Sequence, residues 1–172
     1  ATLLLGNESN LQSGVGVDAH AFSVDPKRPM WLAGLLWENE VGVDGHSDGD
    51  VAAHAICDAL FAAANIGDLG SNFGTSDPKY AGASGETLLS ETLERVTKAG
   101  FGIANVSVQI VGNRPKIGPR RSAAIAKLSQ ALNGATVSVS ATSTDGLGFT
   151  GEGKGISAIA IALVYKLSTA GN

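Results

Sequence analysis

The three histidines of this chain lie within one stretch of 35 residues, and each has an aspartate within four positions. They form three local patterns: Asp18-Ala-His20, His46-Ser-Asp-Gly-Asp50, and His54 with Asp58. Imidazole and carboxylate groups together are the ligands that Zn²⁺ and related divalent ions bind. The pattern therefore favours a fold that gathers these side chains around a metal ion. The alternative interpretation is a set of surface histidines and of aspartates that cap helices.

The spacing of apolar residues predicts a single α+β domain, with a mixed β-sheet backed by helices. A length of 172 residues suits one domain, expected over 14–168, with tails at 1–13 and 169–172. Strands are expected over 14–20, 31–37, 103–111, 135–143 and 156–167. Helices are expected over 51–64, 84–99 and 119–132, and a loop over 67–83.

The predicted elements place the candidate ligands on shared faces. Asp18 and His20 are two residues apart on a strand, so they project from the same side of it. His54 and Asp58 are four residues apart on a helix and share its face. A set of Asp18, His20 and His54 leaves a fourth zinc position open, which is typical of a catalytic site. Asp58 is expected either as an acceptor for an imidazole N–H or as solvent-exposed helix surface.

Composition excludes several classes of protein. Apolar residues make up 44% of the chain, which excludes a largely disordered protein, and no apolar run has the length of a membrane span. The single cysteine, Cys57, cannot form an internal disulfide and fits a reducing compartment. A net charge of −4 disfavours a nucleic-acid partner. We therefore expect a cytoplasmic protein of bacterial type that binds neither membrane nor nucleic acid.

Two further segments could carry chemistry. Residues 146–151 spell G-x-G-x-x-G, but a strand is expected after them where a dinucleotide site needs a helix. The hydroxyls of Thr142, Ser143 and Thr144 beside Asp145 suit a phosphate and a cation such as Mg²⁺ better. Four of the twelve basic residues also fall within eight positions, which indicates an anion site or a solvent-exposed helix start; they are Arg114, Lys116, Arg120 and Arg121.

These features together resemble the family of 2-C-methyl-D-erythritol 2,4-cyclodiphosphate synthases, lyases of non-mevalonate isoprenoid (terpenoid) biosynthesis. The resemblance extends from about residue 14 to residue 167. It is carried by D-x-H at 18–20, by H-S-D-G-D-V-A-A-H at 46–54, and by the segments 67–70, 73–78, 114–116 and 141–155. The spaced D-x-H and H-S-D-G-D-V-x-x-H are specific as a pair.

The resemblance implies a role for each matching position. Asp18, His20 and His54 match the ligands of one Zn²⁺ per subunit, and Asp145 matches a ligand of a second cation, Mg²⁺ or Mn²⁺. His46 and Ser143 match catalytic residues. The zinc ligands Asp18 and His20 and the catalytic residues His46 and Ser143 also match substrate contacts. The other substrate-binding matches are Ser47, Asp68, Leu69, Gly70, Phe73, Gly74, Thr75, Ser76, Asp77, Thr142, Thr144, Asp145 and Phe149. The cytidine-binding matches are Gly112, Asn113, Arg114, Pro115, Lys116, Ile117 and Gly118.

The implied reaction converts 4-diphosphocytidyl-2-C-methyl-D-erythritol 2-phosphate into 2-C-methyl-D-erythritol 2,4-cyclodiphosphate and CMP. The implied assembly is a homotrimer with active sites between subunits, where the cytidine pocket comes from a neighbour. A divalent-metal phosphodiesterase or phosphatase, and a metal-binding trimer without activity, are the alternatives. The sequence departs from the family pattern at five positions: Asp145 replaces Glu, Ser143 replaces Thr, Gly74-Thr75 replaces Pro-Asp, and Arg114 replaces a small residue.

Overall fold

The computed structural model describes residues 10–74 and 77–168, which form an α+β domain built on a four-stranded mixed sheet. The strand order is β1-β6-β4-β5, with β1 at Leu11–Ala21, β6 at Gly155–Lys166, β4 at Phe101–Val111 and β5 at Val137–Thr142. β6 is antiparallel to both β1 and β4, and β5 runs parallel to β4. The predicted fold class, a mixed sheet backed by helices, is confirmed.

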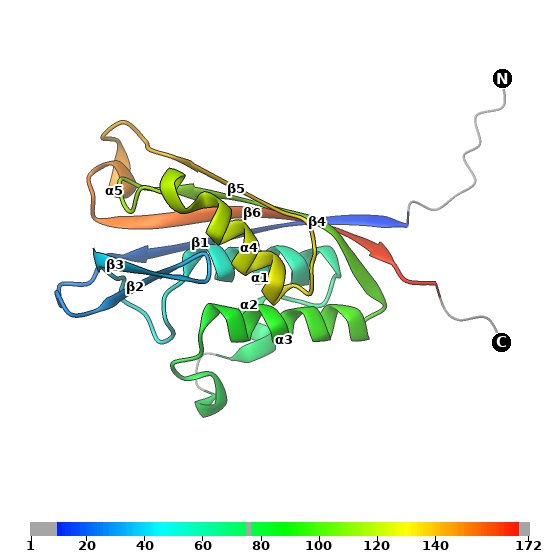
Figure 1. Ribbon diagram of the computed structural model, residues 1–172. Helices are drawn as coiled ribbons and strands as arrows, with labels where there is room; N and C mark the ends of the chain where they lie inside the picture. The colour runs from blue at the N-terminus through cyan, green and yellow to red at the C-terminus, as the bar shows by residue number, and fades with distance from the viewer. Residues whose placement is uncertain (1–9, 75–76, 169–172) are drawn as a thin grey trace, which may run out of the picture.

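The main helices lie together on one face of this sheet, and none of the described helices covers the other face (Figure 1). They are α1 at Val51–Ala63, α3 at Gly85–Lys98 and α4 at Arg121–Ala131. A separate hairpin pairs β2 (Pro29–Leu32) with β3 (Leu35–Val41). The remaining elements are short: α2 (Leu69–Phe73), α5 (Gly148–Gly151) and the 3₁₀ turns η1 (Pro78–Tyr80) and η2 (Gly118–Arg120).

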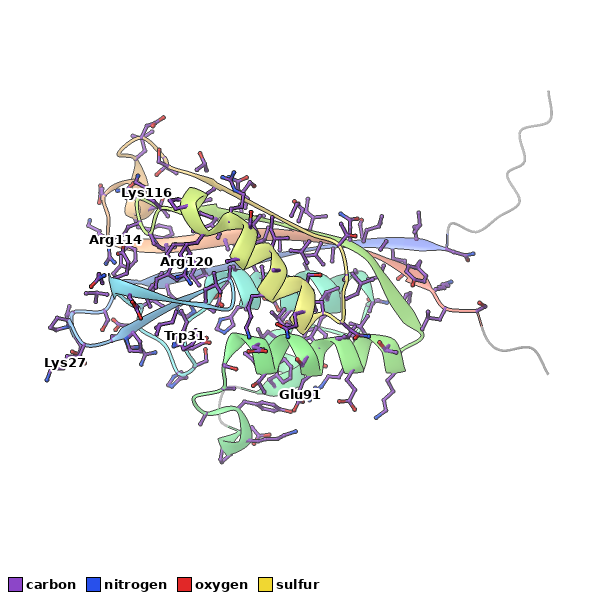
Figure 2. All side chains as sticks on the ribbon, in the orientation of Figure 1. Lys27, Trp31, Glu91, Arg114, Lys116 and Arg120 are labelled. Carbon is purple, nitrogen blue, oxygen red and sulfur yellow. The ribbon has the colours of Figure 1, made fainter. Side chains whose placement is uncertain are left out.

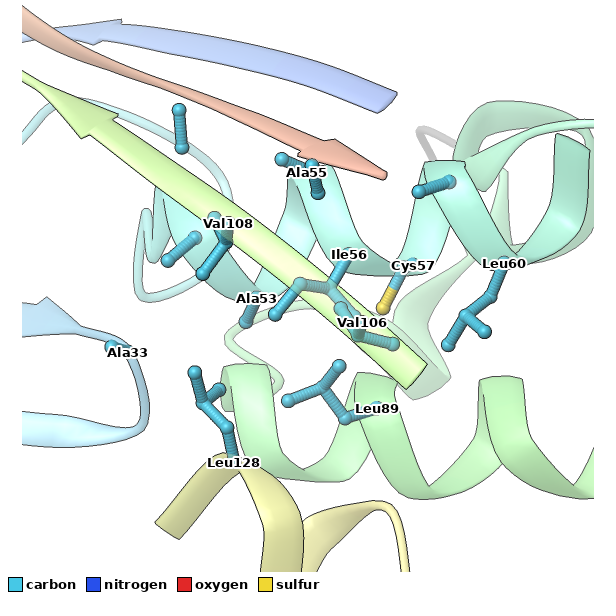
Figure 3. Close-up of a cluster of buried hydrophobic side chains, with 14 of the residues drawn as sticks. Ala33, Ala53, Ala55, Ile56, Cys57, Leu60, Leu89, Val106, Val108 and Leu128 are labelled. Carbon is cyan, nitrogen blue, oxygen red and sulfur yellow. The ribbon is translucent and has the colours of Figure 1, made fainter. Parts of the chain in front are cut away.

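The hydrophobic core fills the space between α1, the sheet and the outer helices (Figure 3). Ile56 and Leu60 of α1 pack near Val106 of β4, and Leu89 of α3 and Leu128 of α4 close the core from outside. All five side chains are fully buried. Burial of such side chains contributes roughly 1.5–3 kcal/mol each, so α1 is fixed against the sheet.

The start of α1 is tied to the β2–β3 turn by one buried carboxylate. Asp50 caps the helix by accepting hydrogen bonds from the backbone N–H groups of Ala52 (3.1 Å) and Ala53 (3.0 Å). It also accepts from Ala33 (2.8 Å) and Gly34 (2.7 Å), which form the turn of the hairpin. The helix that carries His54 is therefore held at its N-terminus by a second element.

The structure corrects several predicted boundaries. The single strand expected over 31–37 is wrong, because Ala33 and Gly34 adopt positive φ angles of 53° and 74° and reverse the chain into a hairpin. The loop expected over 67–83 contains α2 and η1. β1 begins at Leu11, so residues 11–13 belong to the sheet rather than to the expected tail. Residues 1–9 and 169–172 of the expected tails lie outside the described residues.

Helix α1 rests directly on β1 because the strand presents glycine there. A Cβ at Gly16 would lie 2.1 Å from the carbonyl oxygen of Ala55, and one at Gly14 would lie 2.3 Å from that of Ala59. Such distances are far below van der Waals contact. The small residues on both elements therefore set how closely α1 approaches the strand.

We expect Gly16→Ala to lower the free energy of unfolding by about 1–3 kcal/mol, because the new methyl group meets helix backbone that has no room to move. Urea denaturation followed by circular dichroism measures this change. The matched control is Gly118→Ala, since a Cβ there would meet nothing within 4 Å. Equal stability of the Gly16→Ala and Gly118→Ala proteins would contradict the packing argument.

Candidate active site

Three side chains from two elements converge at one point beside the sheet. Asp18 and His20 extend from β1, and His54 extends from the first turn of α1. The Asp18 Oδ2 atom lies 3.1 Å from His20 Nε2 and 3.0 Å from His54 Nδ1. These three potential ligand atoms all lie within 4.8 Å of one another. This cluster, called the triad below, is the one that the sequence predicted on a shared strand face and a helix.

The chemistry of the triad fits a bound metal ion. The His20 Nε2 atom is buried and makes no hydrogen bond of acceptable geometry to any described residue, although Asp18 is close. A buried nitrogen without a hydrogen-bond partner is costly, and a metal ion would satisfy it. One carboxylate and two imidazoles also form a donor set that Zn²⁺ accepts, with a further coordination position left for substrate.

Electrostatics within the triad favour its charged forms. Burial alone would raise the pKa of Asp18, but the imidazoles of His20 and His54 outweigh burial and hold that pKa well below its ordinary value. Burial likewise opposes the charged form of His54, yet the contact with Asp18 raises the pKa of this imidazole. A divalent cation would replace the proton on His54, so metal binding is expected to release protons.

The second ring nitrogen of His54 is oriented by Ser47. The Ser47 hydroxyl lies 3.1 Å from His54 Nε2, and it accepts a hydrogen bond from the backbone N–H of Gly49. Arg28 fixes the same loop by donating to the carbonyl oxygens of Gly45 (3.1 Å) and Ser47 (2.8 Å). Outer partners of this kind set the orientation of metal-binding histidines.

Asp58 does not serve as the imidazole acceptor that the sequence left open as one of two roles. Its Oδ1 atom accepts a hydrogen bond from the backbone N–H of Leu69 at 2.6 Å, at the start of α2. Partial burial raises the pKa of this carboxyl group, and the hydrogen bond from Leu69 partly offsets the effect. Asp58 therefore anchors α2 to α1, which helps to place the loop segment beside the triad.

The triad opens into a pocket of about 370 Å³. Among the expected substrate residues, those that line this pocket beside the triad are His46, Ser47, Leu69, Phe73, Gly74 and Asp77. Asp68 lies outside it as the exposed N-cap of α2, where hydrogen bonds from Ser71 lower the pKa of the carboxyl group. Gly70 does not line it either. Thr75 and Ser76 lie outside the described residues.

Three lining residues were not found from the sequence: Tyr80, Ala81 and Leu88. Tyr80 and Ala81 belong to the segment expected as loop, and no spacing marked them. Leu88 follows the helical period of α3 and is typical of a core residue. Its position at the pocket became visible only from the packing of α3 against α1.

A second pocket, of about 470 Å³, lies between the end of β4 and the end of β5. Six of the seven expected cytidine residues line it: Gly112, Asn113, Pro115, Lys116, Ile117 and Gly118. Thr142 and Ser143 line it as well, together with Arg121. No described residue lines both pockets, so one subunit does not bring His46 and Ser143 into the same pocket. Thr144, Asp145 and Phe149 line neither.

The basic cluster divides into two pairs with different roles. Arg114 forms an ion pair with Glu40 at 3.0 Å and stacks 3.6 Å from the ring centroid of Phe22, so it does not line the second pocket. Arg120 stacks on Trp37, and both arginines lie beside the β2–β3 hairpin (Figure 2). Only Lys116 and Arg121 of the four line the second pocket. The cluster is therefore not one anion site, and half of it binds the hairpin.

Comparison with known proteins identifies the family to which this chain belongs. The model of the YgbB family matches residues 11–165, and the chain belongs to that family. A 2-C-methyl-D-erythritol 2,4-cyclodiphosphate synthase from Acidothermus cellulolyticus is 50% identical over 152 residues, covering 88% of this chain and 92% of that protein. The activity of this chain is 2-C-methyl-D-erythritol 2,4-cyclodiphosphate synthesis, a lyase reaction of the non-mevalonate isoprenoid pathway. The resemblance inferred from the motifs is confirmed.

Other relatives are longer than this chain. A protein from Clavibacter michiganensis named bifunctional enzyme IspD/IspF is 55% identical over 159 residues, and the chain spans 92% of its own length but 38% of that protein. The solved structure of the bifunctional IspDF from Campylobacter jejuni matches with a TM-score of 0.85 at 30% identity, over 92% of this chain and 43% of that one.

A solved structure of a 2-C-methyl-D-erythritol 2,4-cyclodiphosphate synthase with CDP bound has a similar length to this chain. It matches with a TM-score of 0.80 at 33% identity, over 89% of this chain and 99% of that one.

A helix that spans a bilayer needs both sufficient length and an apolar character. Within residues 10–74 and 77–168, no helix meets both conditions.

We expect His54→Ala to lose most of its bound divalent metal, because two ligands remain where three converge. Metal analysis of the purified protein by mass spectrometry measures this loss. His46→Ala is the matched control for metal content, since His46 lines the same pocket but is not part of the triad. Full metal occupancy in His54→Ala would remove this residue from the ligand set.

Proposed function

We propose that the chain forms the cyclic diphosphate by intramolecular attack of the substrate's 2-phosphate oxygen on the β-phosphorus of its cytidine diphosphate group. A new phosphorus–oxygen bond closes the ring, the bond from the β-phosphorus to the bridging oxygen breaks, and CMP leaves. The observation that carries this proposal is the triad, whose ligand atoms face a pocket lined by His46 and Ser47. The attacking oxygen is already an anion, so no strong general base is required.

The residues of the pocket have the roles that such a reaction needs. Asp18, His20 and His54 would hold one Zn²⁺, which supplies Lewis-acid polarisation of a phosphate when bound. His46 and the Ser47 hydroxyl bind the phosphate at the mouth of the pocket and limit its motion, and positioning is the main source of catalysis in phosphoryl transfer.

The second pocket supplies the nucleotide site. Lys116 and the backbone of residues 112–118 surround a space suited to the cytidine and its phosphate, and Ser143 stabilises developing charge with its hydroxyl. Asp145, which accepts a hydrogen bond from Ser143 at 3.2 Å, provides a carboxylate for a second hard cation, Mg²⁺ or Mn²⁺. The relative with CDP bound supports a cytidine nucleotide as ligand.

The two pockets are joined by assembly into a homotrimer. The face of the sheet that carries no helices exposes paired apolar residues: Val15 opposite Ile161 and Val17 opposite Ile159. These four side chains are 43–60% exposed. A contiguous apolar patch on a sheet marks a protein interface, and burying it against two further copies places one subunit's nucleotide pocket beside another's triad.

The reaction predicts CMP release without consumption of water. Incubation with the cytidylyl substrate is expected to give CMP and a cyclic diphosphate in the ³¹P NMR spectrum, and a chelator is expected to abolish both products. A linear phosphorylated product would instead indicate a phosphodiesterase or phosphatase. CMP release at full rate after metal removal would contradict the role of the triad.

The assembly predicts that Ile161→Glu converts the trimer into monomers and abolishes CMP release, since three carboxylates cannot be buried together at the interface. Light scattering is expected to give three times the monomer mass of 17.3 kDa for the wild type and the monomer mass itself for the variant. Lys98→Glu, an exposed change on the opposite, helix-covered side, is the matched control. A wild-type mass of 17.3 kDa in solution would overturn the trimer.

A further inference from the structure

One wall of the candidate substrate pocket is built from two aromatic side chains, Phe73 and Tyr80. Their rings pack edge to face with centroids 4.8 Å apart, and Phe73 also packs on Phe61 of α1 at 5.7 Å. Phe73 ends α2 and Tyr80 ends η1, so the wall depends on two short elements that have little structure of their own. Another part of the molecule must hold them in place.

Arg95 of α3 contacts both short elements at once. Its Nη1 atom donates to the backbone carbonyl and to the side-chain Oδ1 (3.2 Å) of Asn72, which precedes Phe73. Its guanidinium carbon lies 4.6 Å from the centroid of the Phe73 ring, and its Nη2 atom donates to the Tyr80 hydroxyl at 3.1 Å. A planar guanidinium can make these contacts together, whereas an ammonium group cannot.

Glu91, one helical turn before Arg95, completes the arrangement (Figure 2). Its carboxylate accepts a hydrogen bond from the Tyr80 hydroxyl at 2.8 Å and pairs with Lys79 at 3.1 Å. These two contacts hold the pKa of Glu91 below its ordinary value. The Tyr80 hydroxyl is thus fixed between a guanidinium and a carboxylate on the same face of α3.

The same segment also reaches the loop that carries His46. The backbone N–H of Gly82, two residues after Tyr80, donates to the His46 carbonyl oxygen at 3.1 Å. At the start of α3, the N–H of Gly85 donates to Asp48 at 2.6 Å. Contacts that fix Tyr80 therefore support the backbone of His46 as well as the aromatic wall.

Arg95 and Glu91 do not touch the pocket themselves. They line a separate polar groove of about 490 Å³ between α3 and the short elements, together with Asn72, Lys79, Glu94 and Lys98. The groove and the substrate pocket have no described residue in common. Any effect of Arg95 on the reaction must therefore pass through Phe73, Tyr80 and the segment between Tyr80 and His46.

We propose that Arg95, held by Glu91, is a positioning residue that sets the affinity of the pocket for the part of the substrate that lies beside the triad. This role rests on the proposed function, in which that pocket binds the substrate next to the triad. A wall that is already ordered costs less conformational entropy when the substrate binds, so the pair acts on binding more than on the chemical step.

The test is a kinetic comparison of Arg95→Met with the wild-type trimer. We expect KM for the cytidylyl substrate to rise about tenfold while kcat stays within about twofold. Metal content and the dissociation constant for CDP are expected to stay unchanged, because the triad and the nucleotide pocket do not contact Arg95. A merely structural role would instead lower kcat through loss of folded enzyme and leave KM unchanged.

Further variants refine the test. Arg95→Lys keeps the charge but lacks the planar fork, so we expect only partial recovery of KM. Tyr80→Phe keeps the aromatic wall but removes the hydroxyl that joins Arg95 and Glu91, and a rise in KM of about threefold is expected. Tyr80→Phe also carries the test if Arg95→Met does not fold. Glu94 and Lys98 line the same groove but make no contact with Phe73 or Tyr80 that the structure shows. Glu94→Gln and Lys98→Met are therefore expected to retain wild-type kinetics.

The possible outcomes distinguish the positioning role of Arg95 from the proposed function of the protein. An active wild-type protein with an unchanged KM in both Arg95→Met and Tyr80→Phe would overturn the positioning role alone. A rise in KM accompanied by equal weakening of CDP binding would overturn it too, because the effect would then be general. Wild-type protein that releases no CMP would overturn the proposed function and this role with it.

Discussion

The close approach of α1 to β1 is the constraint on which the rest of the site depends. Gly14 and Gly16 leave no side chain between the strand and the helix, so the two backbones come nearly into contact. That distance brings His54 of α1 within 3.0 Å of Asp18 on β1. A strand with larger residues at these positions would move the helix outward and separate the ligands. The glycines therefore allow α1 to pack closely against β1, and this close packing produces the metal-binding geometry.

The triad could be predicted from the sequence because its members obey local periodicity, whereas Ser47 and Arg28, which support it, were not predicted in that role. A spacing of two residues along a strand places Asp18 and His20 on one face. An amphipathic helical pattern places His54 in the first turn of the following helix. The β2–β3 hairpin could not be predicted in the same way. Its turn residues, Ala33 and Gly34, lack the usual Asn-Gly signal and are held by Asp50, a residue 16 or 17 positions away.

The charged residues show the same limit. Arg114 and Arg120 belong to a basic cluster in sequence, but Glu40 and Trp37, more than 70 residues earlier, determine where their side chains lie. Tyr80 was missed for a related reason, because its place in the pocket depends on Arg95 in the next helix. Roles fixed by one element could be predicted from spacing, whereas roles fixed by contacts between distant segments required the structure.

In the proposed trimer, the triad of one subunit works with the nucleotide pocket of another. Co-expression of His54→Ala and Lys116→Ala chains tests it most directly, since each variant lacks one half of every site. In mixed trimers, some interfaces join an intact triad to an intact Lys116, and CMP release at about one quarter of the wild-type rate is expected from random assembly. Mixed trimers with no activity above that of the separate variants would contradict the account.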